Sequence, residues 1–399
     1  MILSRKSSFE FIALMASLMA MAALAIDAIL PAMATISNVI GITDVRDNQL
    51  LITMIFLGLG VGQLLFGPLS DSFGRKPMVY FGFLVFIAAS FLCVWSTSLD
   101  IMILGRILQG VGLSAPRTIS YSMIRDSFHG NEMARVMSFV TVVFIIVPTL
   151  APALGKYLLE AYNWQAIFYF QLVFCICIAF WFAARQKETL RIENKIPFSR
   201  RLFVSGFWEL MKFKSSLIYT TISGIVMGSF MLYLSASQQI FQVQYGFVEE
   251  FPYIFAGLAI SFGASTFLNG RLVMRFGMEN LIKTSLISFT LTSLIYLILF
   301  YNQTNPSIIV FLTFLVLQFF SLGFLFGNLK SIILQPIGHI AGIGAAITGF
   351  ISTLFAVPIG AFVGSFISTT AYPMFVGFFL CGLVSFLLYI AFKYSKYSH

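Results

Sequence analysis

The chain has 399 residues, of which 59% are hydrophobic and only 10% are charged. So few charged residues could not cover the surface of a soluble protein of this length, so the composition indicates an integral membrane protein. The net charge of +9 does not indicate a nucleic-acid partner, because the basic residues collect in alternate short loops between apolar runs.

The first apolar run begins at Phe11, after Arg5 and Lys6, and continues to about Ala34. It is too long for the core of a signal peptide, and no A-x-A cleavage site follows it. We therefore expect this run to remain in the mature protein as its first membrane span.

Apolar runs of about 20 residues, long enough to cross a bilayer as a helix, recur along the whole chain. They predict an all-α protein with twelve transmembrane helices, near residues 11–34, 48–69, 78–96, 101–123, 135–155, 164–184, 217–237, 252–270, 281–301, 307–327, 342–366 and 372–392. One long polar segment divides them into six and six. We therefore predict an N-terminal six-helix bundle (1–184), a cytoplasmic central loop (185–214) and a C-terminal six-helix bundle (215–399).

The basic residues predict which side of the membrane each loop faces. With the N-terminus placed inside, the inner segments hold twenty of the 24 Lys and Arg residues, and the outer segments hold two, Arg46 and Lys156. Because basic loops remain in the cytoplasm, we expect both termini to be cytoplasmic.

The turn between the second and third spans joins two glycines, one acid and two bases. It reads Gly67-Pro-Leu-Ser-Asp71-Ser-Phe-Gly74-Arg75-Lys76-Pro77, and its pattern G-x-L-x-x-x-F-G recurs 203 residues later at Gly270–Gly277. The repeat lies at the equivalent turn of the second half. It therefore predicts two pseudo-symmetric halves related by an axis along the membrane normal, with a central cavity between them.

These features together resemble the major facilitator superfamily. The turn matches its G-x-x-x-D-x-x-G-R-[RK] signature, and Arg106-Ile-Leu-Gln109-Gly110-Val-Gly112 is similar to its R-x-x-Q-G-x-G motif. The segment Pro148-Thr-Leu-Ala-Pro152-Ala-Leu-Gly155 resembles the antiporter motif of the Bcr/CflA-type drug:proton antiporters. The resemblance implies a monomeric, multi-pass protein of the bacterial inner membrane.

The chain departs from the family pattern at two places. Val147 precedes Pro148 where the antiporter motif usually has Gly, and Met274 stands in the second-half turn where the first-half turn has Asp71. These departures concern the subgroup and not the expected fold.

Charges within the spans are the sharpest functional clue, because a charge at the centre of a bilayer costs at least about 2.5 kcal/mol. Three such residues are Asp27, Arg106 and Arg117. Asp27 and Arg106 lie roughly 10 and 8 Å below the outer face at a rise of about 1.5 Å per residue, so they could meet across the cavity. Our hypothesis is that Asp27 takes and releases the coupling proton and that contact with Arg106 switches its proton affinity. The alternative is a static ion pair or a backbone cap.

Two more polar residues on the fourth span belong to this candidate site. Gln109 is expected to pack or hydrogen-bond near Arg106. Arg117 falls on nearly the same helix face as Arg106, roughly 16 Å further inward, since eleven residues complete about three turns. It either lines the inner cavity and attracts anions or extends toward the inner interface.

The remaining candidates concern conformational change. The resemblance implies a charge-relay latch that includes Asp71, Arg75 and Lys76, in which Asp71 faces a helix N-terminus or a base of the opposite half and holds the inner side shut. The alternative is that these charges are solvated and set topology. Gly67 and Gly74 would permit close helix approach. Pro148, Pro152 and Gly155 predict a bend in the fifth span, where neighbouring groups must satisfy the freed backbone.

No nucleophile triad, P-loop or metal-ligand spacing occurs in the sequence, so we expect no enzyme, no metal and no cofactor. The energy source would be the proton gradient. The leading hypothesis is a proton-coupled exporter of small amphipathic or cationic compounds. The alternatives are a transporter dedicated to one metabolite, such as a siderophore, sugar or amino acid, and a non-transporting membrane receptor or lipid-handling protein.

Overall fold

All regular secondary structure in the described residues is helical. The computed structural model describes residues 5–42, 44–128, 150–195, 207–301, 304–336 and 341–397, together with Val136, Val140 and Val147. The labelled helices are α1 (Arg5–Asp27), α2 (Met33–Ile40), α3 (Val45–Phe73), α4 (Arg75–Val94), α5 (Leu99–Ser127), α7 (Gln165–Arg185), α9 (Lys214–Gln238), α10 (Phe251–Phe276), α11 (Met278–Leu299), α12 (Ile308–Leu334), α13 (Ala341–Gly364) and α14 (Tyr372–Tyr397). Residues 150–161 and 207–212 are also helical. Short 3₁₀ turns occur at Leu30–Ala32 and Ile192–Asn194, and Gln239–Gln244 form a π-helix.

The predicted all-α membrane fold is confirmed. Ten segments within the described residues are long and apolar enough to cross a membrane, and each coincides with one of the predicted spans. The predicted span 101–123 is helical throughout, as part of α5, but is less apolar than the others. Most of the predicted span 135–155 lies outside the described residues.

The chain divides into two compact units. The first contains Met1–Thr43 and Met54–Leu202, and the second contains Asp44–Thr53 and Phe203–His399. The first turns of α3 therefore cluster with the second unit, and the rest of that helix clusters with the first.

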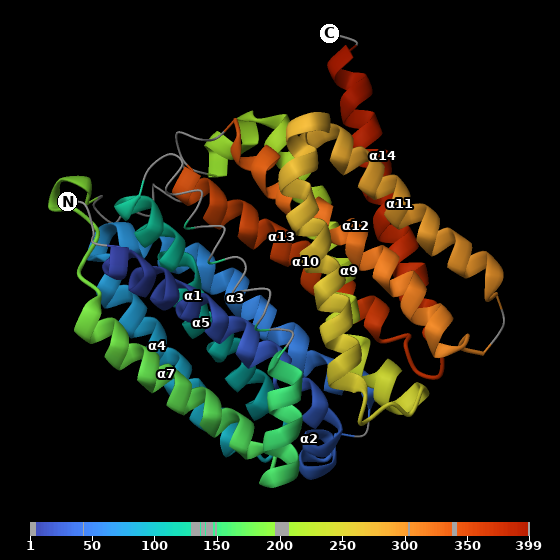
Figure 1. Cartoon of the computed structure of the whole chain (residues 1–399), viewed down its shortest axis with the longest axis horizontal. Coiled ribbons are helices and arrows are strands. Elements are labelled where there is room, and N and C mark those ends of the chain that lie inside the picture. Colours follow the sequence, from blue (N-terminus) through green and yellow to red (C-terminus); the bar gives the residue numbers. More distant parts are fainter. Residues whose placement is uncertain are drawn as a thin grey trace. The chain divides into compact units, whose positions relative to one another are not determined.

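In the first unit (Figure 1), the glycines of α5 let two neighbouring helices, α3 and α4, approach closely. A Cβ atom on Gly110 would meet the carbonyl oxygen of Ile55 in α3, and one on Gly112 would lie 2.6 Å from the backbone nitrogen of Phe86 in α4. Backbone atoms cannot rotate away as side chains can. The two glycines of the R-x-x-Q-G-x-G motif thus have a steric role, one on each side of α5.

The second unit has an aromatic core. Tyr296 of α11 stacks on Phe375 of α14, with ring centroids 3.7 Å apart, and Phe311 and Phe314 of α12 pack edge-on against the pair. Such large apolar surfaces hold three helices together in this unit.

The predicted internal repeat appears in the backbone of each unit. Gly74 alone separates α3 from α4, and Gly277 alone separates α10 from α11; their φ/ψ angles are 108°/155° and 76°/156°. Positive φ with extended ψ is open to glycine and strained for other residues. The sequence had suggested a longer turn, but residues Gly67–Phe73 are helical and Gly74 makes the turn by itself.

The repeat also includes a buried polar contact. In the first unit, Nε2 of Gln109 donates to the hydroxyl of Ser90, 2.8 Å away, and in the second, Nε2 of Gln318 donates to Ser293 at 2.6 Å. Ser293 lies 203 residues after Ser90, the same offset that separates Gly277 from Gly74. Corresponding turns and corresponding polar contacts support a duplicated bundle.

The close approach of α5 to α3 can be tested with Gly110→Ala. The added methyl group overlaps the Ile55 carbonyl, so we expect a loss of roughly 1–3 kcal/mol in stability, measured as a lower unfolding temperature of the purified protein. Gly257→Ala is the control, because nothing lies within 4 Å of a Cβ atom at this site in α10. Equal unfolding temperatures for the two variants would contradict the packing.

Candidate functional site

Asp27 lies where the first membrane span is interrupted. α1 ends at this residue, and the 3₁₀ turn that follows contains Pro31. Proline has no N–H to bond the carbonyl four residues earlier, which here belongs to Asp27, so the helical ladder cannot continue. The side chain of Asp27 is only 4% exposed. Within the part of the chain that the structure describes, its carboxylate makes no hydrogen bond or ion pair.

Gly155 of the fifth span packs directly on this interruption. A Cβ atom at Gly155 would meet the carbonyl oxygen of Ala28 and lie 3.1 Å from its Cα atom. Pro152 and Gly155 are both buried, and Pro148 lies outside the described residues. The glycine of the antiporter-like segment therefore contacts the backbone immediately after the candidate proton carrier.

Arg106 occupies the buried centre of a polar network between three helices. Its Nη1 donates to the carbonyl of Ala25 in α1 at 3.0 Å and to Oε1 of Gln109 at 2.9 Å. Gln109 in turn donates to Ser90 of α4. Arg106 and Gln109 are both fully buried. The predicted contact between Gln109 and Arg106 is thus present.

The guanidinium of Arg106 contacts α1 at Ala25, two residues before Asp27. The structure shows no ion pair between the two side chains, because the guanidinium binds the Ala25 carbonyl instead. The partial negative charge of the Ala25 carbonyl lowers the free-energy cost of burying the Arg106 guanidinium. This contact does not neutralise the charge of Asp27. The proposed switching contact between Asp27 and Arg106 stays a prediction.

Arg117 lies further along α5 and is half-buried. Its backbone carbonyl accepts a hydrogen bond from the hydroxyl of Ser120 at 2.9 Å. Its suggested part in attracting anions stays a prediction.

The residues of the signature turn form an ion-pair cluster at the predicted inner face. Arg75 is 2% exposed and donates to Ser70 at 2.7 Å, to Asp71 at 2.5 Å and to Asp126 of α5 at 3.0 Å. Two carboxylates and a hydroxyl surround this guanidinium, so Arg75 is a buried structural cation and not a solvated charge. Gly67 lies within α3, where its carbonyl accepts from the Ser70 hydroxyl.

Glu188, in the segment after α7, caps the N-terminus of α4. Its carboxylate accepts from the backbone nitrogens of Arg75 at 3.1 Å and Lys76 at 3.0 Å, and the Lys76 ammonium donates to the carbonyl of Gln186. Carboxylates at a helix N-terminus satisfy free N–H groups and interact favourably with the helix dipole. The beginning of the central loop is thereby tied to the signature turn.

Sequence reasoning missed Glu188 and one buried glutamine. The signal for Glu188 was an acid just after the sixth span, on the same predicted side as Gly74. Gln171 of α7 is 2% exposed, and neither of its amide atoms has a hydrogen-bond partner among the described residues. No sequence pattern marked Gln171.

Comparison with known proteins agrees with the sequence motifs. The model of the Major Facilitator Superfamily matches residues 14–357. The "Bicyclomycin resistance protein homolog" of Haemophilus influenzae is 28% identical, over 96% of both chains, and "Multidrug resistance protein MdtL" of Shewanella oneidensis is 27% identical over 73% of both. The structure of the xylose transporter XylE from E. coli superposes with a TM-score of 0.74 at 12% identity, over 97% of this chain and 98% of that one, and so shows a shared fold.

The cap on α4 can be tested with Glu188→Ala. Removing the carboxylate leaves the backbone N–H groups of Arg75 and Lys76 without an acceptor, so we expect a loss of about 1–2 kcal/mol in stability. The measurement is thermal unfolding in detergent, with Glu193→Ala at an exposed position of the same segment as the control. A Glu188→Ala protein that unfolds at the control's temperature would rule out the cap.

Proposed function

Because the chain belongs to the Major Facilitator Superfamily, a family of membrane transporters, we propose that it is a proton-coupled exporter of small amphipathic or cationic compounds. The names of two relatives, a bicyclomycin resistance protein homolog and a multidrug resistance protein, support export of drug-like molecules. The chain is a multi-pass membrane transporter and not an enzyme.

The observation that carries the proposal is the buried carboxylate of Asp27. An acid in an apolar bundle is costly unless it is neutralised, and this one has no partner in the described residues. Protonation removes the charge. A transporter that presents Asp27 to each side of the membrane in turn would therefore load a proton on one side and release it on the other.

In this scheme the neighbouring groups position Asp27. Arg106 binds the carbonyl of Ala25, and Gly155 contacts Ala28, so α5 and the fifth span contact the chain on either side of the acid. A cationic or amphipathic substrate that approaches Asp27 competes with the proton for the same carboxylate. Competition of this kind produces antiport, because the bound substrate and the bound proton exclude each other.

The ion-pair cluster at the predicted inner face would control closure on that side. We propose that Asp71, bound to the buried Arg75, forms part of the contact that holds the inner side shut. We further propose that the protein functions as a monomer in the bacterial inner membrane, with both termini in the cytoplasm. The proton gradient would be its energy source, and no cofactor would be needed.

The role of Asp27 is tested by Asp27→Asn in proteoliposomes with an imposed pH gradient. The amide cannot take and release a proton, so compound-induced proton flux should be abolished across a panel that includes bicyclomycin. Asp100→Asn, at an exposed position at the start of α5, is the control and should transport normally. Undiminished proton-coupled transport by the Asp27→Asn protein would refute the assignment.

The role of the inner cluster is tested by Asp71→Asn in the same assay. The variant keeps the size of the side chain but weakens its charge-assisted bond to Arg75, so we expect slower transport with unchanged insertion and topology. Transport at the wild-type rate would count against closure through Asp71.

A further inference from the structure

The N-termini of α4 and α11, which correspond to each other in the two units, differ in whether their backbone N–H groups have hydrogen-bond acceptors. In the first unit, Glu188 accepts the N–H groups of Arg75 and Lys76, and the next residue is Pro77, which has none. In the second unit, the corresponding residues are Met278, Glu279 and Asn280. Their three N–H groups have no acceptor within residues 207–301, 304–336 and 341–397. The first turn of α11 thus presents unused donors where α4 presents none.

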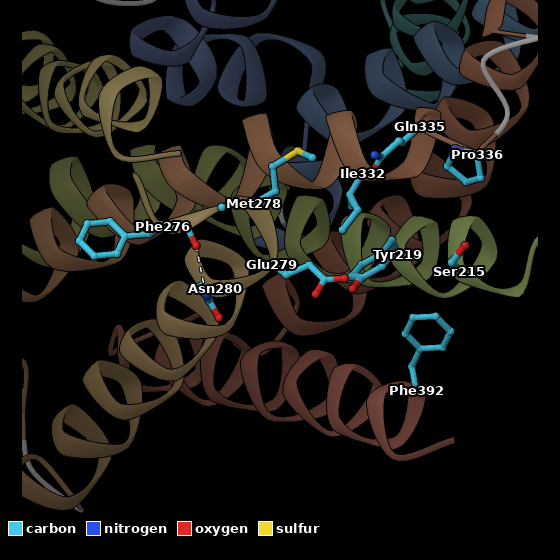
Figure 2. A pocket seen from close by; sticks show the side chains of 11 residues that line it. Ser215, Tyr219, Phe276, Met278, Glu279, Asn280, Ile332, Gln335, Pro336 and Phe392 are labelled. Carbon is cyan, nitrogen blue, oxygen red and sulfur yellow. Dashed lines mark hydrogen bonds between the residues drawn. The ribbon is translucent and has the colours of Figure 1, made fainter. Parts of the chain in front are cut away.

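A cavity of about 480 Å³ adjoins these donors (Figure 2). It lies between the starts of α9 and α11 and the ends of α12 and α14, and its lining includes Ser215, Tyr219, Gly277, Gln335 and Phe392. At the corresponding helix N-terminus of the first unit, the Glu188 carboxylate accepts from the backbone. In the second unit, α14 continues as a helix to Tyr397.

Tyr219 supplies an independent sign that the cavity takes a polar ligand. The residue is 1% exposed, its ring packs against Phe392, and its hydroxyl is buried with no hydrogen-bond partner in the described structure. Figure 2 shows the side chain beside Glu279 at the N-terminus of α11. A buried hydroxyl left without a hydrogen-bond partner is destabilising, and a ligand in the cavity that accepts from it would remove this cost.

We propose that this cavity binds a phosphate group at the N-terminus of α11. The N–H groups of Met278, Glu279 and Asn280 and the hydroxyl of Tyr219 are four donors and would face its oxygens, as helix N-termini do in other phosphate sites. The Glu279 carboxylate also lies at the cavity, and Lys393 pairs with it, so its charge is compensated. The Asn280 side chain is already engaged, since its Nδ2 donates to the carbonyl of Phe276 at 3.0 Å.

The level of the site in the membrane favours a lipid headgroup as the source of that phosphate. α11 begins a candidate span at Met278, so its first turn lies at the predicted membrane interface, where lipid phosphates are found. The exposed Arg275 and Lys283 flank this turn and add positive charge. Free phosphate from the cytoplasm has the same chemistry, and the experiment separates the two sources.

The test counts lipids bound to the purified full-length protein by native mass spectrometry during titration with phosphatidylglycerol. Tyr219→Phe removes one donor but keeps the ring on Phe392, and Asn280→Pro removes one N–H as Pro77 does in the first unit. Each variant should raise the apparent dissociation constant of the retained lipid by about tenfold or more. Tyr245→Phe, whose hydroxyl bonds the Pro306 carbonyl elsewhere in the unit, is the control and should bind as the wild type does.

Two further titrations identify the ligand. Diacylglycerol with the same acyl chains carries no phosphate and should not be retained. Displacement of phosphatidylglycerol by inorganic phosphate would assign the site to free phosphate, and resistance to displacement would assign it to the lipid headgroup. Equal retention of diacylglycerol and phosphatidylglycerol, or wild-type affinity in both Tyr219→Phe and Asn280→Pro, would overturn the proposal.

Discussion

The cost of placing charge among apolar helices governs the arrangement of the first unit. Arg106 meets that cost with a helix carbonyl and an amide oxygen, and Arg75 meets it with two carboxylates and a hydroxyl. Asp27 is buried like them and yet has no partner among the described residues. Both buried cations therefore bind groups of the protein itself, and under the proposed function the buried acid would bind a proton or a substrate.

Backbone contacts connect this acid to its surroundings more directly than side chains do. The helix stops at Asp27 because of Pro31, and Gly155 packs against the carbonyl of Ala28. Gly110 makes a similar contact between α5 and α3. Contacts between main chains without intervening side chains transmit small shifts, because neither partner can rotate to absorb them. A displacement of the fifth span would consequently move the chain beside Asp27.

The sequence was sufficient to predict the all-α membrane fold and the family, because long apolar runs and glycine-rich motifs are local signals. It also placed Gln109 next to Arg106, since three residues separate neighbours on one helix face. It could not predict that Arg106 binds Ala25 or that Glu188 caps α4. Those contacts join residues 81 and 113 positions apart and depend on how the helices pack. The length of the signature turn was overestimated because Pro68 and Gly67, which usually break helices, are accommodated within α3.

The most direct test of the central claim is proton release when a transported compound binds to purified protein in weakly buffered detergent solution. If the compound displaces a proton from Asp27, the wild-type protein should acidify the solution on binding. The Asp27→Asn protein should then bind the compound with no change in pH. Equal proton release by the two proteins, at equal occupancy, would contradict the account.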